Sequence, residues 1–155
     1  MLVIGLLELG LAFRDFLTVS TASTDGARVA SLMGNDADAD CEVVMAVTAA
    51  ITTAISIETV DRIDIFKADP NGNKIPSKTN TWQYLAGDPL DCGNWSNTNN
   101  WPPGERQTLA GSEALDIAGV QVVAEHAWFS GMAPFSGTID VDETTLTRLE
   151  PEGYE

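Results

Sequence analysis

The chain has 155 residues, of which 44% are hydrophobic, and it carries a formal net charge of −15 at pH 7. This length suits one domain, and this apolar content is enough for a hydrophobic core. The acidity argues against nucleic acid or an anionic membrane surface as a partner, because both are negatively charged as well.

The first thirteen residues, MLVIGLLELGLAF, are apolar apart from one carboxylate, Glu8. At about 1.5 Å per residue they reach about 20 Å, which is shorter than the roughly 30 Å core of a bilayer. They also lack the basic flank and small-residue cleavage site of a secretory signal. A half-helix that is apolar on all sides is driven into lipid, detergent or other copies of itself, so the segment predicts assembly.

Helical periodicity continues beyond this run and predicts one long helix over residues 1–33, ended by Gly34 and Asn35. Residues 34–155 are then expected to form a globular head domain. The residues that recur along the predicted packing face of the helix are Phe13, Phe16, Leu17, Ala27, Ala30 and Leu32.

A second helix is predicted over residues 38–55, antiparallel to the first, with Asp38 or Asp40 as its N-cap. Strands are predicted over residues 60–68, 118–129 and 144–150, and the sequence DPNGNK after the first of them is typical of a turn. Residues 79–111, rich in Asn, Pro, Gly and Trp, read as a long irregular loop. Helices followed by strands predict an α+β fold, with both helices packed on a small antiparallel sheet.

Cys41 and Cys92 are the two cysteines, and their separation matches no metal-binding spacing. A single disulfide is expected if the protein works outside the cytoplasm. The alternative is two buried free thiols.

Two groups of alternating oxygen ligands resemble fragments of calcium loops, but neither completes one. A helix cap and a solvated turn are the favoured interpretations, and no metal or other cofactor is expected. The residues concerned are Asp36, Asp38 and Asp40 in the first group and Asp69, Asn71 and Asn73 in the second.

His126 is the only histidine. No serine or threonine stands in a nucleophile motif, so His126 is expected to have a structural or hydrogen-bonding role and the chain is not expected to be an enzyme.

Trp82, Trp95 and Trp101 lie among Asn and Asp residues, a composition that occurs on sugar-binding surfaces. The favoured alternative is that these rings anchor the loop to the sheet. Asn94 begins an Asn-Trp-Ser glycosylation sequon.

The segment GLLELGLAFRDFLTVSTASTDGARVAS resembles the N-terminal helix of TadE-like pilins and pseudopilins of tight-adherence pili, which are related to type IV pili. The matching positions are Glu8, Gly10, Gly26, Ala27, Arg28 and Ala30. Two further segments, VDRIDIFKADPNGNKIP and GVQVVAEHAWFSGMAPFSG with TLTRLEP, resemble the strand and turn after the second helix and the C-terminal hairpin of that family.

The resemblance implies a pilin-like fold and a structural subunit of a surface filament, with Glu8 as an electrostatic contact between subunits. The implied partners are copies of the chain or other pilins, together with an inner-membrane assembly machinery. The implied location is an extracellular filament or the cell surface, after membrane insertion before assembly. The assembly interface is expected to contain Met1, Leu2, Ile4, Gly5, Leu6, Glu8, Leu9, Phe13, Arg14 and Phe16.

Two other functions stay open at this point. One is a membrane-tethered surface domain that binds glycans through the tryptophan loop. The other is a minor pseudopilin of a pilus built from another subunit.

Overall fold

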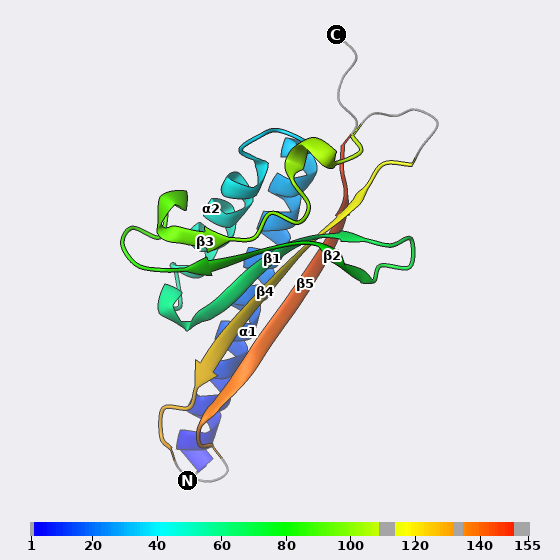
Figure 1. Cartoon of the computed structure of the whole chain (residues 1–155). Coiled ribbons are helices and arrows are strands. Elements are labelled where there is room, and N and C mark those ends of the chain that lie inside the picture. The colour runs from blue at the N-terminus through cyan, green and yellow to red at the C-terminus, as the bar shows by residue number, and fades with distance from the viewer. Residues whose placement is uncertain (1, 109–113, 132–134, 151–155) are drawn as a thin grey trace.

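A computed structural model describes residues 2–108, 114–131 and 135–150 of the chain. Two helices, α1 (Leu2–Met33) and α2 (Ala39–Ile51), pack against one sheet of five strands (Figure 1). The strands lie in the order β3-β2-β1-β4-β5, and each neighbouring pair is antiparallel. The α+β fold is therefore confirmed. The strands are β1 (Val60–Ala68), β2 (Lys74–Tyr84), β3 (Trp95–Asn97), β4 (Ile117–Ala127) and β5 (Thr138–Arg148).

The upper half of α1 is held between α2 and the sheet by small residues. Gly26 lies so close to both that an added Cβ would be 2.5 Å from Val47 of α2 and 3.1 Å from Val120 of β4. Ala22 and Ala30 extend this face and are fully buried. Small side chains let the helix approach closely, so the larger valines of α2 and β4 fill the core.

The predicted packing face of α1 is confirmed for Ala27 and Ala30 but wrong for its four large residues. Phe13, Phe16, Leu17 and Leu32 are 62%, 43%, 48% and 68% exposed. The physical reason is that the contact with α2 and the sheet is tight, so that, apart from Val19, the residues buried there are small. Gly34 has a φ of +51° and ends the helix as predicted.

The hairpin of β4 and β5 runs beside α1 as far as the N-terminal end of the helix (Figure 1). α2 ends much earlier, at Ile51. Among the described residues, the lower part of the molecule therefore consists mainly of α1 and the hairpin, with residues 54–56 and Thr59 beside them. We call this part the stalk and define it as residues 2–17 with residues 126–131 and 135–139.

The prediction of an irregular loop over residues 79–111 is wrong for residues 79–84, which belong to β2, and for residues 95–97, which form β3. β2 runs through to Tyr84, and β3 pairs with it so that Tyr84 lies opposite Trp95. The sequence KIPSKTNTWQY shows little apolar alternation and contains Pro76, so the usual signal of a strand is weak there.

Other element ends differ from prediction by a few residues. β4 ends at Ala127 rather than at residue 129, and β5 begins at Thr138 rather than at residue 144, because its first half is polar and acidic. α2 ends at Ile51 rather than at residue 55. Asp38 does hold the N-cap position of α2, although its side chain makes no capping hydrogen bond to the described residues.

The disulfide between Cys41 and Cys92 is present and joins the first turn of α2 to the segment before β3. Beside it lies a buried ion pair between Asp40 and Arg106. Asn80 of β2 donates a 2.7 Å hydrogen bond to the same carboxylate. These links attach the β2–β3 side of the sheet to α2.

Candidate assembly surface

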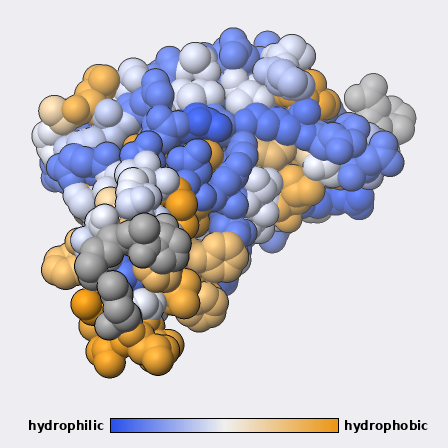
Figure 2. All heavy atoms as spheres, turned by 90° about the horizontal axis from the view of Figure 1, so that it is seen from below, coloured by the Kyte–Doolittle hydropathy of each residue, from blue (hydrophilic) through white to orange (hydrophobic). Residues whose placement is uncertain are grey.

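Large apolar side chains are exposed on every side of the stalk portion of α1 except the side that packs against the hairpin. Leu2 is 82% exposed and Leu6 66%. The view from below in Figure 2 shows hydrophobic residues gathered at this end, whereas hydrophilic residues cover most of the remaining surface. Contiguous patches of this kind are rare on monomeric proteins and mark contact surfaces. The exposed set on α1 up to residue 17 is Leu2, Val3, Ile4, Leu6, Leu7, Leu9, Leu11, Phe13, Phe16 and Leu17.

Glu8 lies in the middle of this apolar segment but is itself only 1% exposed. Its carboxylate accepts hydrogen bonds from the backbone N–H groups of Phe129, at 3.0 Å, and of Ser130. Two amide donors compensate for the loss of hydration that burial of a carboxylate would cost. In the single chain, the oxygens of Glu8 are bound inside the molecule. The role of Glu8 as a contact between subunits stays a prediction.

Two further contacts hold the tip of the hairpin on α1. Asp15 lies 2.7 Å from Nδ1 of His126, which is 4% exposed, so the hydrogen-bonding role expected of this histidine is confirmed. An added Cβ on Gly5 would lie 3.5 Å from the ring of Phe135, so the helix backbone approaches that ring directly. Trp128 lies between His126 and Phe135, with ring centroids 5.0 Å from each; its ring is edge-on to His126 and tilted by 55° relative to Phe135. The stalk is thus one packed unit of helix and hairpin.

A groove of about 360 Å³ lies on the stalk at the step where α2 ends. Phe13 and Leu17 line it from α1, and Ala50 lines it from the last turn of α2. Gly10 opens onto free space, since an added Cβ there would meet no atom of the described residues within 4 Å. Arg14, whose side chain is 52% exposed, lies at the same groove. We call this the step groove.

Most of the residues predicted for the assembly interface are exposed in the structure. Gly5 is instead half-buried against the hairpin, Glu8 is buried, and Met1 lies outside the described residues. Arg14 pairs with Asp15 at 2.8 Å. The exposed members are Leu2, Ile4, Leu6, Leu9, Phe13, Arg14 and Phe16.

The three tryptophans proposed for glycan contact are buried. Trp82, Trp95 and Trp101 are 6%, 5% and 1% exposed, and all three belong to the hydrophobic core. A buried ring offers no free face on which a sugar can stack, so this prediction is wrong and the alternative, that the rings anchor the segment, is confirmed. The Asn94 side chain donates a 2.9 Å hydrogen bond to the carbonyl of Asp88, and its glycosylation stays a prediction.

The acidic groups considered as calcium ligands have other partners. Asp69 accepts hydrogen bonds from the backbone N–H groups of Asn71 and Asn73, both at 2.8 Å, and so shapes the β1–β2 turn as expected. The hydrogen bond from the Asn73 side chain, followed by those from the backbone N–H groups of Asn73 and Asn71, lowers the pKa of Asp69. Asp40 pairs with Arg106. The described residues contain no group of three or more His, Cys, Asp or Glu that could hold a metal ion.

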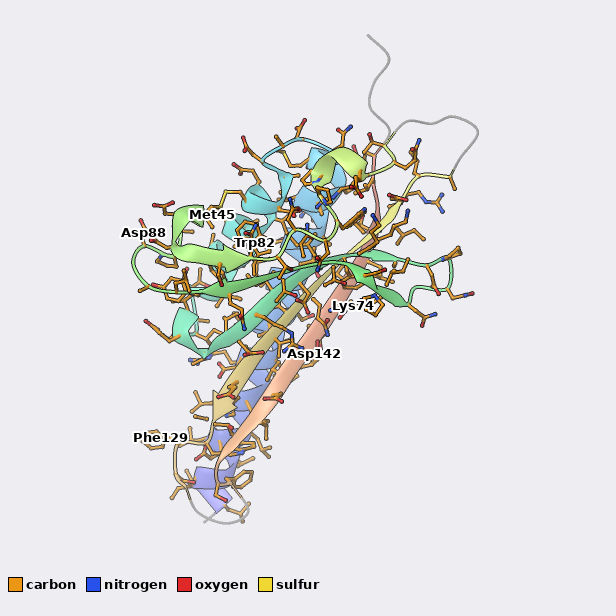
Figure 3. The ribbon with its side chains drawn as sticks, in the orientation of Figure 1. Met45, Lys74, Trp82, Asp88, Phe129 and Asp142 are labelled. Carbon is orange, nitrogen blue, oxygen red and sulfur yellow. A yellow bond between two sulfur atoms is a disulfide. The ribbon has the colours of Figure 1, made fainter. Side chains whose placement is uncertain are left out.

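A polar network crosses the face of the sheet opposite the helices. Its centre is Asp64, which is 2% exposed and accepts hydrogen bonds from Lys74 at 2.7 Å and Thr81 at 2.6 Å. Lys74 also binds Gln121, which binds Asp142 on β5. Burial alone would raise the pKa of Asp64, but the hydrogen bonds from Lys74 and Thr81, the charge of Lys74 and the hydrogen bond from Arg62 bring it below its usual value. Figure 3 labels Lys74 and Asp142 on this face.

Sequence reasoning missed one prominent member of the surface. Phe129 lies two residues beyond the end of β4 and is 88% exposed, more than any other large apolar residue among those described. Figure 3 shows its ring pointing away from the hairpin. The signal was present in the sequence AWFSG, because an aromatic residue just before a Ser-Gly turn lies beyond the end of the strand rather than inside it.

No family model matches the chain, and no curated protein or solved structure matches it either. Within the described residues, both helices fall short of the combined length and apolarity that a membrane crossing requires.

Proposed function

We propose that this chain is a non-enzymatic structural subunit of an extracellular pilus-like filament of the TadE-like type, and that it assembles through the apolar stalk. One observation carries the proposal: the stalk exposes ten large apolar side chains on α1, and its only acid within residues 2–13 is buried and bound inside the chain. Exposed apolar area of this kind is stabilised by burial at about 25 cal/mol per Å².

The distribution of charge supports contact through the stalk rather than through the rest of the molecule. α1 carries three acids and two arginines, so residues 34–155 hold 14 of the 15 net negative charges. Like charges repel when two such surfaces approach, and the repulsion is reduced where charge is absent. Two copies can therefore meet most readily at the apolar end of α1, while the acidic surfaces face solvent.

The partners proposed for this role are copies of the chain or other pilins, with an inner-membrane machinery that inserts the subunit in the membrane and then exports it. An extracellular or surface location agrees with the disulfide between Cys41 and Cys92, since disulfides persist mainly outside the cytoplasm. The stalk could also serve a minor pseudopilin, and the share of this chain in isolated filaments distinguishes the two roles.

The proposal is tested with the purified chain kept in detergent and then diluted out of it. We expect light scattering to rise and negative-stain microscopy to show filaments of regular width. Leu6→Asp should abolish them, because a charge in the contact must be desolvated, whereas Leu85→Asp should not. Leu85 is the matched control, because it is 64% exposed, like Leu6 at 66%, but follows β2 and lies outside the stalk. A wild-type chain that stays monomeric after dilution would contradict the proposal.

A further inference from the structure

We infer that Phe129 of one subunit inserts into the step groove of the next, and that Glu8 is the positioning residue that presents Phe129 for this contact. The inference rests on the proposed function and adds to it the two surfaces that meet. It assigns the tip of the β4–β5 hairpin, which lies far from the N-terminal helix in sequence, to the assembly interface.

The first surface is the exposed ring of Phe129. Its backbone N–H is bound by Glu8 at 3.0 Å, and the next N–H, of Ser130, is bound by the same carboxylate. The backbone is thus fixed while the ring remains 88% exposed. A large apolar side chain on a fixed backbone loses less conformational entropy on binding than one on a mobile backbone. Interface anchors have this property.

The second surface is the step groove, whose lining suits an aromatic occupant. Phe13 and Leu17 supply apolar walls, and the free space above Gly10 leaves room for an entering ring. Arg14 lies at the groove with a half-exposed side chain. A guanidinium group beside an aromatic face is attracted to the negative charge of the ring face.

A second copy of this chain is the occupant that the charges favour. The groove is lined mostly by α1, the element that carries almost none of the net charge, and Phe129 lies at the same end of the molecule as the N-terminal part of α1. A second copy brings a surface of equally low charge to the groove. A partner without such a surface would approach a chain of net charge −15 less readily.

The geometry of such a contact leads to a filament rather than a closed dimer. Phe129 and the step groove are different patches of the same molecule, so the contact is heterologous. Two bound subunits therefore leave one step groove free at one end of the pair and one Phe129 free at the other end. Repetition of a heterologous contact that does not close into a ring builds an open helical polymer.

The direct test replaces Phe129 by the photo-reactive residue p-benzoylphenylalanine, which keeps an aromatic ring at the position. This chain is mixed with ¹⁵N-labelled wild-type chain, assembled, irradiated and analysed by mass spectrometry. We expect cross-links between unlabelled and labelled chains at Leu17 or Thr21. Thr21 lies thirteen residues, about 20 Å, along the helix from Glu8, so a cross-link there does not arise within one chain. Leu85→p-benzoylphenylalanine is the matched control and should give no such product.

Two substitutions test the same contact without the probe. Phe129→Ala removes the ring, and Gly10→Leu fills the groove at a position where an added Cβ meets nothing within 4 Å among the described residues. We expect each to reduce filament yield at least about tenfold, the effect of losing an anchor worth about 1.4 kcal/mol or more, whereas Leu85→Ala leaves it unchanged. Circular dichroism verifies that each variant is folded.

The outcomes separate this inference from the proposed function. Filaments that form normally from Phe129→Ala and Gly10→Leu, without cross-links to the groove, would overturn the inference while Leu6→Asp still abolished assembly. A wild-type chain that forms no filaments would contradict both.

Discussion

The carboxylate of Glu8 and the backbone N–H of Phe129 are joined by a 3.0 Å hydrogen bond across 121 residues of sequence. With the bond from Ser130, this contact fastens the tip of the β4–β5 hairpin to the first turns of α1. A buried carboxylate in an apolar helix thus has an explanation within one chain, and the stalk becomes a composite of two distant segments.

Glu8→Ala should release the hairpin tip without unfolding the protein. The two amides would lose their acceptor, while the α2 and sheet contacts of the upper half of α1 would remain. We expect faster hydrogen exchange at the amides of Phe129 and Ser130, measured by NMR or mass spectrometry, and unchanged exchange in β1. Glu8→Gln retains one acceptor oxygen and should give an intermediate effect. Equal exchange in wild type and Glu8→Ala would show that the contact does not hold the tip.

Asp64 should make stability depend on pH in the acid range. Its folded-state pKa is below its unfolded value of about 3.9, because Lys74 and Thr81 stabilise the ionised form despite burial. The folded state therefore binds fewer protons, and this stabilisation is complete above about pH 4 and is lost as the pH falls through the folded-state pKa.

Asp64→Asn should remove that acid-range dependence and cost about 2 kcal/mol at pH 7, the value typical of hydrogen bonds to charged groups. Urea unfolding at several pH values measures both. The idea would be wrong if wild type and Asp64→Asn lost stability in parallel below pH 4.

Arg106→Met should be strongly destabilising. The Arg106 side chain is fully buried and pairs with Asp40, whose side chain is 8% exposed. Removal of the guanidinium leaves a buried carboxylate with Asn80 as a remaining donor, which typically costs about 3–5 kcal/mol. Asp40→Asn combined with Arg106→Met should recover part of the loss in denaturant titrations. Additive losses in the double variant would argue against coupling of the two charges.

Gly26→Ala should destabilise the contact of α1 with α2, even though alanine favours helix. The new Cβ would lie 2.5 Å from Val47, closer than such atoms approach. Overpacking of this kind typically costs about 1–3 kcal/mol. Adding Val47→Ala should make Gly26→Ala better tolerated than in the wild-type background, as measured by thermal unfolding. No rescue would mean that the clash lies elsewhere, for example at Val120.

Several parts of this structure follow from sequence patterns that have a single physical interpretation. A long helix ended by Gly34 and a turn built on Asp69 depend on local chemistry, so both were predicted. β2 was missed because it shows little apolar alternation and contains Pro76. The small-residue face around Gly26 was predicted only at Ala27 and Ala30, because large side chains were also expected on it.

The candidate site could be predicted only for the segment that is contiguous in sequence. The apolar residues from Leu2 to Leu11 stand together, so a contact surface was predicted there, whereas Phe13 and Phe16 were also placed on the packing face of α1 and are exposed. The partner of Glu8 was not, because nothing local to the helix indicates that β4 and β5 extend along it to bring Phe129 and Ser130 within hydrogen-bond distance. Contacts across 121 residues depend on the register of the sheet and on strand length.

The most direct measurement is cryo-electron microscopy of filaments sheared from cells that produce this protein, with mass spectrometry of their composition. We expect filaments that contain this chain, with α1 stalks inside, acidic surfaces outside, and density for Phe129 against Phe13 and Leu17 of a neighbouring subunit. Filaments that lack this chain, or in which its apolar stalk faces solvent, would contradict assembly through the stalk.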